Sequence, residues 1–305
     1  MAFPRNLDLE ARLVADPDDD LGFEIYGDWL HSHGSPHGEL IQIQRALRGE
    51  PRNVALRRRE AELMERHGAE LVGPSFGDRI HHLGWSAGFV ESAELSVEGL
   101  IELNAYPAGL VPRELLVHGD PWLQSAIDRL VMLPPTLRRL RLAVGRRGTD
   151  AGALLGDVTA LWQAQLRLTH LTVQGGAIEL GNVASSCLRE LVLQPTTLTA
   201  DHLRALAAAA LPALERLELW FEHDHEWSNQ DDEGNRWDHR ILRCAIELHD
   251  VRGLLATTQL PALRELRLVN TPLGDALCDV IAASPLAPQL RRLALNRGTI
   301  TSAGA

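Results

Sequence analysis

The apolar positions in the second half of the chain repeat in one fixed pattern. Leucine, valine or isoleucine recurs at relative positions 1, 4, 6 and 11 of the segments that begin at Leu168, Leu188, Leu263 and Leu290. Successive side chains of a β-strand point to opposite faces, so positions 4 and 6 share one face and positions 3, 5 and 7 share the other. The pattern therefore predicts a short strand in each segment, with its leucines buried and positions 3, 5 and 7 aligned in rows across neighbouring strands.

The same pattern, with weaker residues, continues toward the N-terminus. In all it predicts eight strands, beginning near residues 90, 112, 137, 168, 188, 214, 263 and 290. Several segments between them carry alanine and leucine at helical spacing, for example 199–210 and 275–283. A strand and a return segment every roughly 20 to 29 residues are typical of a leucine-rich repeat. We therefore expect an α/β fold, a right-handed leucine-rich-repeat solenoid (horseshoe) with strands on its concave wall and helices outside.

The first part of the chain lacks this pattern and predicts helices. Asn6 stands where a helix-capping side chain is expected, and Asp16 does so before Pro17, a residue favoured at the first helical position. The acidic residues that follow Pro17 suit the positive end of a helix dipole. We expect a small helical domain over 1–75, followed by the repeat domain over 76–305.

Three phrases in this helical segment resemble a known family. They are ADPDDD at 15–20, YGDWL at 26–30 and HGSPHGELIQIQ at 33–44. Together they resemble the repeat-companion domain, which precedes leucine-rich repeats of the ribonuclease-inhibitor-like kind in myxobacterial and planctomycete proteins. Gly27 and His37 replace the alanine and arginine that are usual in that family. The resemblance implies a bacterial protein in which a helical domain leads into repeats, and it supplies no catalytic residue.

The longest interval between predicted strands holds an insertion. It covers about 221–249 and is rich in histidine, aspartate and tryptophan. A loop inserted where a strand of a repeat ends often contacts a partner. The candidate partner-binding aromatic residues in this insertion are Trp227 and Trp237.

Two groups of histidines are candidates for metal binding. In the insertion these are His223, His225 and His239, but no complete zinc-type spacing is present and we expect no bound metal. The other group, His31, His33 and His37, surrounds a predicted helix end. We interpret that group as cations placed at the negative end of a helix dipole.

The rows formed by positions 3, 5 and 7 supply the other candidate residues. Arginine and tryptophan are enriched among the side chains that anchor protein partners. The rows mix both charges, whereas a nucleic-acid surface shows a stripe of positive charge. The alternative is a set of ordinary exposed ion pairs between strands, each worth less than ~1 kcal/mol. The candidate binding residues in these rows are Arg139, Arg141, His170, Glu190, Arg216, Glu218, Trp220, Glu265, Arg267 and Arg292.

The composition narrows the possible chemistry. All 30 basic residues are arginine, so no mechanism that needs a phosphate-binding or Schiff-base lysine is possible. The net charge of −11 opposes general binding to nucleic acid or to an anionic membrane. The three cysteines lack metal or redox spacing. We expect no catalytic residue and no cofactor.

The ends of the chain and its apolar runs bear on its location and partners. No apolar run reaches the roughly 18 residues of a membrane span, and the N-terminus lacks a secretory signal, so we expect a cytoplasmic protein. From Ile300 the sequence predicts the start of a further helix, so either the last repeat is uncapped or the natural chain is longer. We expect a non-enzymatic protein–protein interaction scaffold that binds through the concave face and the insertion. The alternatives are a structural protein that self-associates through its uncapped last repeat, and a metal-binding or enzymatic role for the insertion.

Overall fold

The chain forms two compact units. The computed structural model describes residues 4–74, 76, 83–119, 122–144, 154–196, 198–221, 246–302 and 304. The first unit comprises 1–117 with 128–140, and the second comprises 118–127 with 141–305. Among the described residues, no helix is both long enough and apolar enough to cross a membrane.

The first unit begins with four helices. The Asn6 side chain accepts a hydrogen bond from the Leu9 amide at 3.2 Å and so caps the first helix, as predicted. The second helix begins later than predicted, because residues 16–19 form a turn in which Asp16 accepts from the Asp18 amide at 3.1 Å. The helices are α1 (Leu7–Ala15), α2 (Asp20–Ser32), α3 (Pro36–Gly49) and α4 (Val54–Val72).

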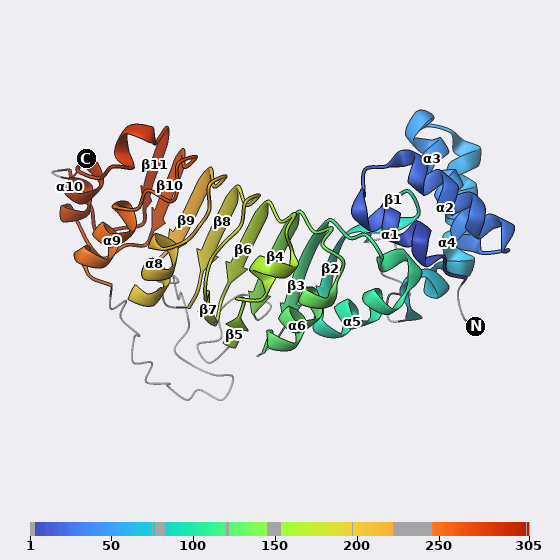
Figure 1. Ribbon diagram of the computed structural model, residues 1–305, viewed down its shortest axis with the longest axis horizontal. Coiled ribbons are helices and arrows are strands. Elements are labelled where there is room, and N and C mark those ends of the chain that lie inside the picture. The colour runs from blue at the N-terminus through green and yellow to red at the C-terminus, as the bar shows by residue number, and fades with distance from the viewer. Residues whose placement is uncertain are drawn as a thin grey trace, which may run out of the picture. The chain divides into compact units, whose positions relative to one another are not determined.

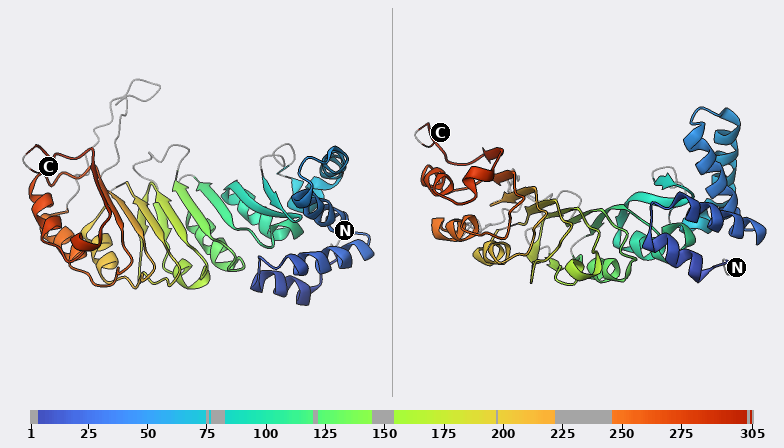
Figure 2. Two further views of the ribbon diagram at one scale, coloured as in Figure 1. Left: turned by 90° about the horizontal axis from the view of Figure 1, so that it is seen from above. Right: turned by 45° about the horizontal axis from the view of Figure 1, so that its top comes forward.

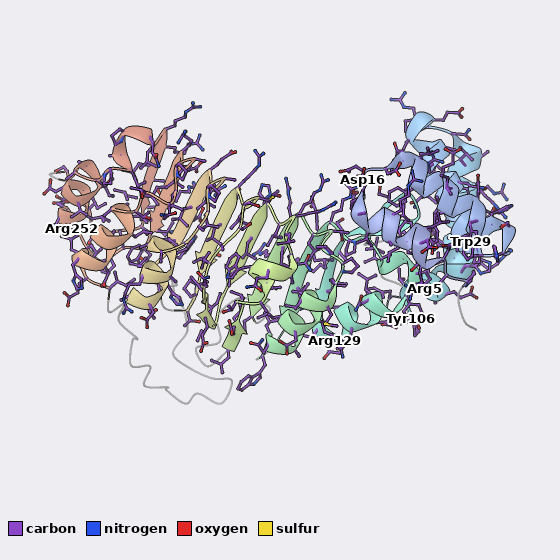
Figure 3. The ribbon with its side chains drawn as sticks, in the orientation of Figure 1. Arg5, Asp16, Trp29, Tyr106, Arg129 and Arg252 are labelled. Carbon is purple, nitrogen blue, oxygen red and sulfur yellow. The ribbon has the colours of Figure 1, made fainter. Side chains whose placement is uncertain are left out.

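The core of these helices includes residues from the strands that follow. Phe23 and Tyr26 of α2 are buried in one cluster with Phe89 and Val111. Trp29, labelled in Figure 3, stacks on Tyr26 with ring centroids 6.2 Å apart. The helical segment and the first strands therefore share one apolar core. The domain boundary near residue 75 stays a prediction.

One carboxylate is buried among the first two helices. Glu10 of α1 is only 5% exposed. It accepts hydrogen bonds from the Nε atom of Arg5 at 3.1 Å and from the Tyr26 hydroxyl at 3.0 Å, and Arg5 is labelled in Figure 3. Burial, followed by the charge of Glu10 and its hydrogen bond, raises the pKa of Tyr26. The buried charge of Glu10 is thus compensated by a cation and a hydroxyl donor.

The strands form one large sheet and one small one. Strand order in the large sheet is β1-β2-β3-β4-β6-β8-β9-β10-β11, and β5 pairs with β7 in a second sheet. Strand β1 is antiparallel to β2, whereas β6, β8, β9, β10 and β11 run parallel in one register (Figure 1). The strands are β1 (Gly84–Ser86), β2 (Phe89–Ser96), β3 (Glu114–Gly119), β4 (Arg139–Val144), β5 (Leu154–Asp157), β6 (His170–Gln174), β7 (Ala177–Glu179), β8 (Glu190–Gln194), β9 (Arg216–Trp220), β10 (Glu265–Val269) and β11 (Arg292–Asn296).

The segments between strands differ from one another. Helices α8, α9 and α10 pack in sequence and lie along one side of the last strands (Figure 2). Elsewhere the connections contain a helix, a short strand such as β7, or a short 3₁₀ turn. These remaining elements are α5 (Val97–Ala105), η2 (Pro107–Gly109), α6 (Gln124–Met132), α7 (Leu161–Ala164), α8 (Ala200–Ala207), α9 (Leu248–Leu255), α10 (Ala276–Ala282) and η3 (Ala287–Gln289).

The α/β class is confirmed, but the right-handed leucine-rich-repeat solenoid is wrong. Each of the eight predicted strands is present: β2 begins at Phe89, one residue before its predicted start, and the other seven begin two residues after theirs. They belong to a mixed sheet of nine strands, and no solenoid is found among the described residues. A solenoid requires similar units stacked throughout. Here the connections vary between helix, strand and 3₁₀ turn, and the first strand pair is antiparallel. The apolar phrase predicted the strands and not the way in which they are assembled.

Candidate functional site

The register of the second unit brings six of the candidate residues into two adjacent rows, and Trp220 lies in the row beside them. Glu190, Arg216, Glu265 and Arg292 lie opposite one another on β8, β9, β10 and β11. In the next row Glu218 lies opposite Arg267, which in turn lies opposite Ala294. Positive and negative side chains therefore alternate from strand to strand. We call the set that this register brings together the arginine–glutamate face: Glu190, Arg216, Glu218, Trp220, Glu265, Arg267 and Arg292.

Glu218 is the centre of the arginine–glutamate face. Its side chain is 9% exposed. One carboxylate oxygen accepts from Arg216 Nη2 at 2.7 Å and from Arg267 Nη1 at 3.1 Å. The other accepts from the Trp220 indole N–H at 2.8 Å. Three donors from two strands thus converge on one buried carboxylate.

These donors keep Glu218 ionised. Burial alone would raise the pKa of the Glu218 carboxyl, but the hydrogen bonds from Trp220, Arg216 and Arg267 outweigh burial and lower it. The acid therefore carries its charge at neutral pH and holds both guanidinium groups and the indole in fixed positions.

The outer members of the arginine–glutamate face are held more loosely. Glu190 lies 3.3 Å from Arg216 Nη1. Glu265 lies 3.4 Å from Arg267 Nε and 3.5 Å from Arg292 Nη1. The Nε atoms of Arg216 and Arg267 are buried without a hydrogen bond in the described part of the chain, so their attraction to Glu265 is an ion pair only. The Arg292 side chain is 70% exposed.

Three other predicted residues do not join this cluster. Arg139 pairs with Glu114 at 3.6 Å. Arg141 donates to the Gln174 side chain at 2.5 Å, and His170 contacts the Thr169 hydroxyl at 2.9 Å. Each has its own local contact, and none is connected to Glu218.

The candidates in the insertion lie outside the described residues, which omit 222–245. They are Trp227, Trp237, His223, His225 and His239. In the described part of the chain, no group of three or more histidine, cysteine, aspartate or glutamate side chains is arranged to hold a metal ion. The metal hypothesis for the insertion stays a prediction.

A polar cavity in the first unit was not predicted. It has a volume of about 230 Å³ and lies between the turn at residues 17–20, the end of α3, the β1–β2 hairpin and residues 111–113. Its guanidinium groups are already paired with acids, since Arg113 contacts Asp18 at 2.6 Å and Arg48 contacts Asp20. The cavity is lined by Pro17, Asp18, Asp20, Phe23, Arg48, Ser86, Phe89, Glu91, Val111 and Arg113.

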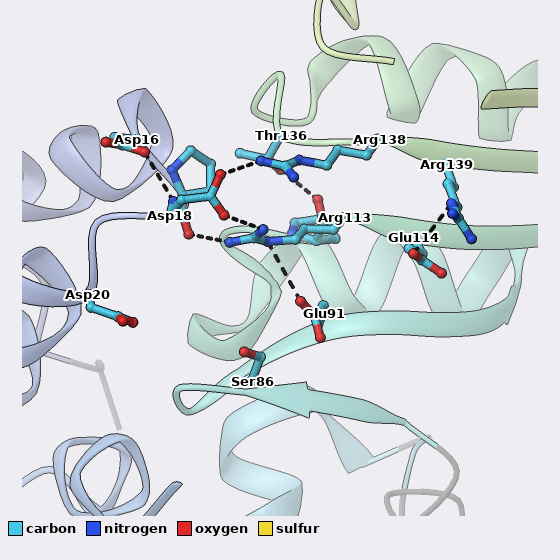
Figure 4. A network of polar contacts seen from close by, with 12 residues as sticks. Asp16, Asp18, Asp20, Ser86, Glu91, Arg113, Glu114, Thr136, Arg138 and Arg139 are labelled. Carbon is cyan, nitrogen blue, oxygen red and sulfur yellow. Dashed lines mark hydrogen bonds and ion pairs between the residues drawn. The ribbon is translucent and has the colours of Figure 1, made fainter. Parts of the chain in front are cut away.

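The ion pairs at this cavity tie the α1–α2 turn to the strands of the first unit (Figure 4). Asp18 is held between the guanidinium groups of Arg113 and Arg138, which come from the segments that enter β3 and β4. Arg113 also donates to the Pro17 carbonyl and lies 3.8 Å from Glu91. The hydrogen bond from Arg113, aided by Arg138 and opposed by burial, lowers the pKa of Asp18. Because these donors already have partners, we interpret the ion pairs as a clamp that holds the α1–α2 turn against the strands, and not as a ligand site.

Replacing Asp18 by asparagine is expected to reduce the free energy of unfolding by about 1 kcal/mol, since a half-exposed pair contributes little even with two partners. The pKa of Asp18 is lowered on folding, so its contribution is present above pH 3.8 and is lost as the pH falls through the folded value. Urea unfolding at pH 7 measures the change, which 1 M salt should reduce. The control is Asp201→Asn, because Asp201 is 78% exposed and, in the described part of the chain, pairs only with Arg204 on the same helix. Equal effects of the two changes would contradict the clamp.

His37 is placed differently from the prediction. It lies in the first turn of α3 and is 1% exposed, not at a helix C-terminus. Its Nε2 lies 2.8 Å from the Gly88 carbonyl, and its ring packs on Phe89 at a centroid distance of 4.8 Å. Burial lowers the pKa of His37 to about 4, against a weaker opposing effect of that carbonyl. Nδ1 has no hydrogen-bond partner among the described residues.

The contact with His37 depends on Gly88. This residue has a φ of +83°, and a Cβ atom there would lie 2.3 Å from a side-chain carbon of Ile41. Its amide donates to the Gln44 side chain at 2.7 Å. A glycine is therefore required where the hairpin meets α3.

Comparisons with known proteins bear on the fold alone. No family model matches the chain, and no curated protein matches it. Among solved structures, it is similar to a crystal structure of a protein from Bacteroides fragilis, with a TM-score of 0.51 and 14% sequence identity. The match covers 77% of this chain and 67% of that one. The resemblance to the repeat-companion domain stays a prediction.

Proposed function

We propose that the chain is a non-enzymatic protein that binds a protein partner through the arginine–glutamate face. The observation that carries this proposal is the convergence of Arg216, Arg267 and Trp220 on the buried carboxylate of Glu218. Arginine and tryptophan are the residue types most often found at the centre of protein interfaces. Here they stand together on one side of a sheet.

The hydrogen bonds to Glu218 reduce the entropy lost on binding. An immobilised long side chain costs about 0.5 to 1.5 kcal/mol when a complex forms. Arg216 and Arg267 are already held by Glu218 and Glu265, although their side chains keep 32% and 31% exposure. A partner would therefore meet side chains that are both accessible and ordered.

A second candidate function is self-association through β11. This strand ends the order of the large sheet. Leu293 of β11 is 44% exposed, whereas Leu266, its neighbour on β10, is fully buried. An exposed edge strand with a half-covered leucine favours pairing with another chain. The contribution of the insertion to either function stays a prediction.

Changing both Trp220 and Arg267 to alanine is expected to weaken capture of the partner at least about thirtyfold, because the loss of even one hot-spot side chain costs ~2 kcal/mol or more. The measurement is affinity capture from the source cell's lysate with the intact chain as bait, followed by mass spectrometry. Titration with the purified partner then gives the change in affinity. The fold is checked by circular dichroism.

The matched control for this experiment is Arg204→Ala, which removes an arginine paired with an acid on α8, away from the sheet face. It is expected to retain the partner. Undiminished capture by the Trp220/Arg267 variant would contradict the proposed site. Recovery of the bait alone would favour self-association.

A further inference from the structure

The polar side of β11 resembles that of β9 at its first and last positions and differs at the middle one. Arg216 and Arg292 occupy the first equivalent position, and both lie in register with Glu265. Trp220 and Asn296 occupy the third, on either side of Val269. Between them, β9 has Glu218 where β11 has Ala294. Two side chains that can donate hydrogen bonds therefore flank a small residue on β11, as two donors flank a carboxylate on β9.

Arg267 lies between these two equivalent positions. It is in register with Glu218 on one side and with Ala294 on the other. Its Nη1 donates to Glu218 at 3.1 Å, whereas its Nη2 has no hydrogen bond within the described ranges. In those ranges the Arg292 side chain makes one hydrogen bond, from Nη1 to Glu265 at 3.5 Å, and the Asn296 side chain makes none. Donors without a hydrogen bond in the described ranges therefore lie on both strands next to Ala294, which is in register with Arg267 and stands between Arg292 and Asn296 on β11.

The charge around this position favours an anion. The segments 214–221, 263–270 and 290–297 together hold six arginines and three glutamates, although the whole chain has a net charge of −11. These three segments, which are the last strands of the sheet with their flanking residues, are thus locally positive on an acidic protein. Such a region attracts acidic partners.

We propose that a carboxylate from an acidic segment of the partner binds above Ala294, between Arg267 and Arg292. This inference rests on the proposed function and names the chemistry of the partner. The incoming carboxylate repeats, in the same row but two strands further along, the arrangement that Glu218 has between Arg216 and Arg267. Asn296 takes the role that Trp220 has toward Glu218 and donates from the same strand. The site selects aspartate or glutamate side chains, since charge-assisted bonds to arginine are strong and directional.

A nucleic acid fits this surface less well. Glu265 lies within 3.5 Å of both Arg267 and Arg292, and Glu190 continues the same row. A continuous run of phosphates would pass close to these acids. Separate carboxylates on an extended segment can contact the arginines without doing so.

The test uses a fluorescein-labelled hexaglutamate peptide, blocked at both ends, with hexaglutamine as the neutral probe. Fluorescence anisotropy at low salt should show binding of the acidic peptide alone. Arg292→Gln is expected to weaken that binding about tenfold, because it removes one charge-assisted hydrogen bond. Arg204→Gln, an exposed arginine on α8, should leave binding unchanged.

A second variant, Ala294→Glu, supplies the carboxylate within the chain. It should abolish binding of the acidic peptide and raise the thermal midpoint, because the new side chain takes the place of the ligand. It also separates a lost site from a lost fold, since a stabilised variant that no longer binds must have its site occupied.

Three outcomes would overturn the inference: hexaglutamate and hexaglutamine bind equally, Ala294→Glu still binds the peptide, or a short oligothymidylate displaces hexaglutamate more effectively than unlabelled hexaglutamate does. If hexaglutamate does not bind while the Trp220/Arg267 variant still loses the captured partner, the inference of a carboxylate site is wrong and the proposed function stands. If capture is insensitive to that variant, the proposed function is wrong.

Discussion

Lowering the pH from 7 to 4 is expected to remove about 3 kcal/mol from the free energy of unfolding through His37 alone. The pKa of this side chain is about 4 in the folded chain and 6.5 for the unperturbed group. The folded state therefore binds fewer protons than the unfolded state between these values. The stability is present in full above pH 6.5, falls as the pH drops toward 4, and loses no more through this group below that.

The physical reason is the position of the His37 ring. Nε2 must carry its proton to donate to the Gly88 carbonyl, so a second proton would go to Nδ1. Nδ1 is buried and has no acceptor among the described residues. Protonation would create a buried cation with an unsatisfied donor, which is costly. The charge of Glu10 opposes this effect only in part.

Urea unfolding of the chain and of His37→Gln, at a series of pH values, measures this contribution. Glutamine keeps an N–H group that can donate to Gly88 and does not titrate. The difference in unfolding free energy between the two proteins should change by about 3 kcal/mol from pH 7 to pH 4. Two parallel curves would show that His37 is not the titrating group.

Replacing Glu218 by alanine is expected to cost about 2 to 3 kcal/mol of stability at pH 7. The change removes three hydrogen bonds and leaves the guanidinium groups of Arg216 and Arg267 without their shared counter-ion. The expected cost is below that of a fully buried pair, because both arginine side chains keep about one third of their exposure. Chemical denaturation at neutral pH, where Glu218 is ionised, measures it.

The matched control is Glu190→Ala on the neighbouring strand. Glu190 has a side-chain exposure of 28% and a single ion pair with Arg216 at 3.3 Å. Its removal should cost less than ~1 kcal/mol. If the two alanine variants were equally stable, Glu218 would be an ordinary surface acid. It would then not hold Arg216 and Arg267 in fixed positions before a partner binds.

The apolar phrase predicted the strands and rows because both depend on local order. Leu217 of β9 and Leu266 of β10 are buried and in register. The side chains that flank each leucine along its strand must therefore share the opposite face of the sheet. This reasoning placed Glu218 beside Arg267 before any contact was known. It could not predict how far Glu218 is buried, since that depends on the three donors arranged around it.

The features that sequence reasoning missed depend on contacts between distant segments. The aspartates after Pro17 were interpreted as helix-start charges, but Asp18 pairs with Arg113 and Arg138, about one hundred residues further along the chain. His37 was assigned to a helix end, but the Gly88 carbonyl lies in a hairpin that packs on α3. Local spacing carries no signal for either contact. The solenoid prediction failed for a related reason, because the apolar phrases do not specify the connections between strands.

The alternation of charge along one row has a consequence for folding fidelity. Segments as alike as those that form β8, β9 and β10 can dock out of order during folding, which is a typical error of chains with similar strands. If β10 docked directly on β8, Glu265 would stand beside Glu190, and Arg267 would face Val192 with no acid. Like charges directly opposite each other destabilise a strand pair. The native order places Arg216 between the two glutamates. The charge pattern therefore destabilises a partly folded sheet in which β9 has been left out.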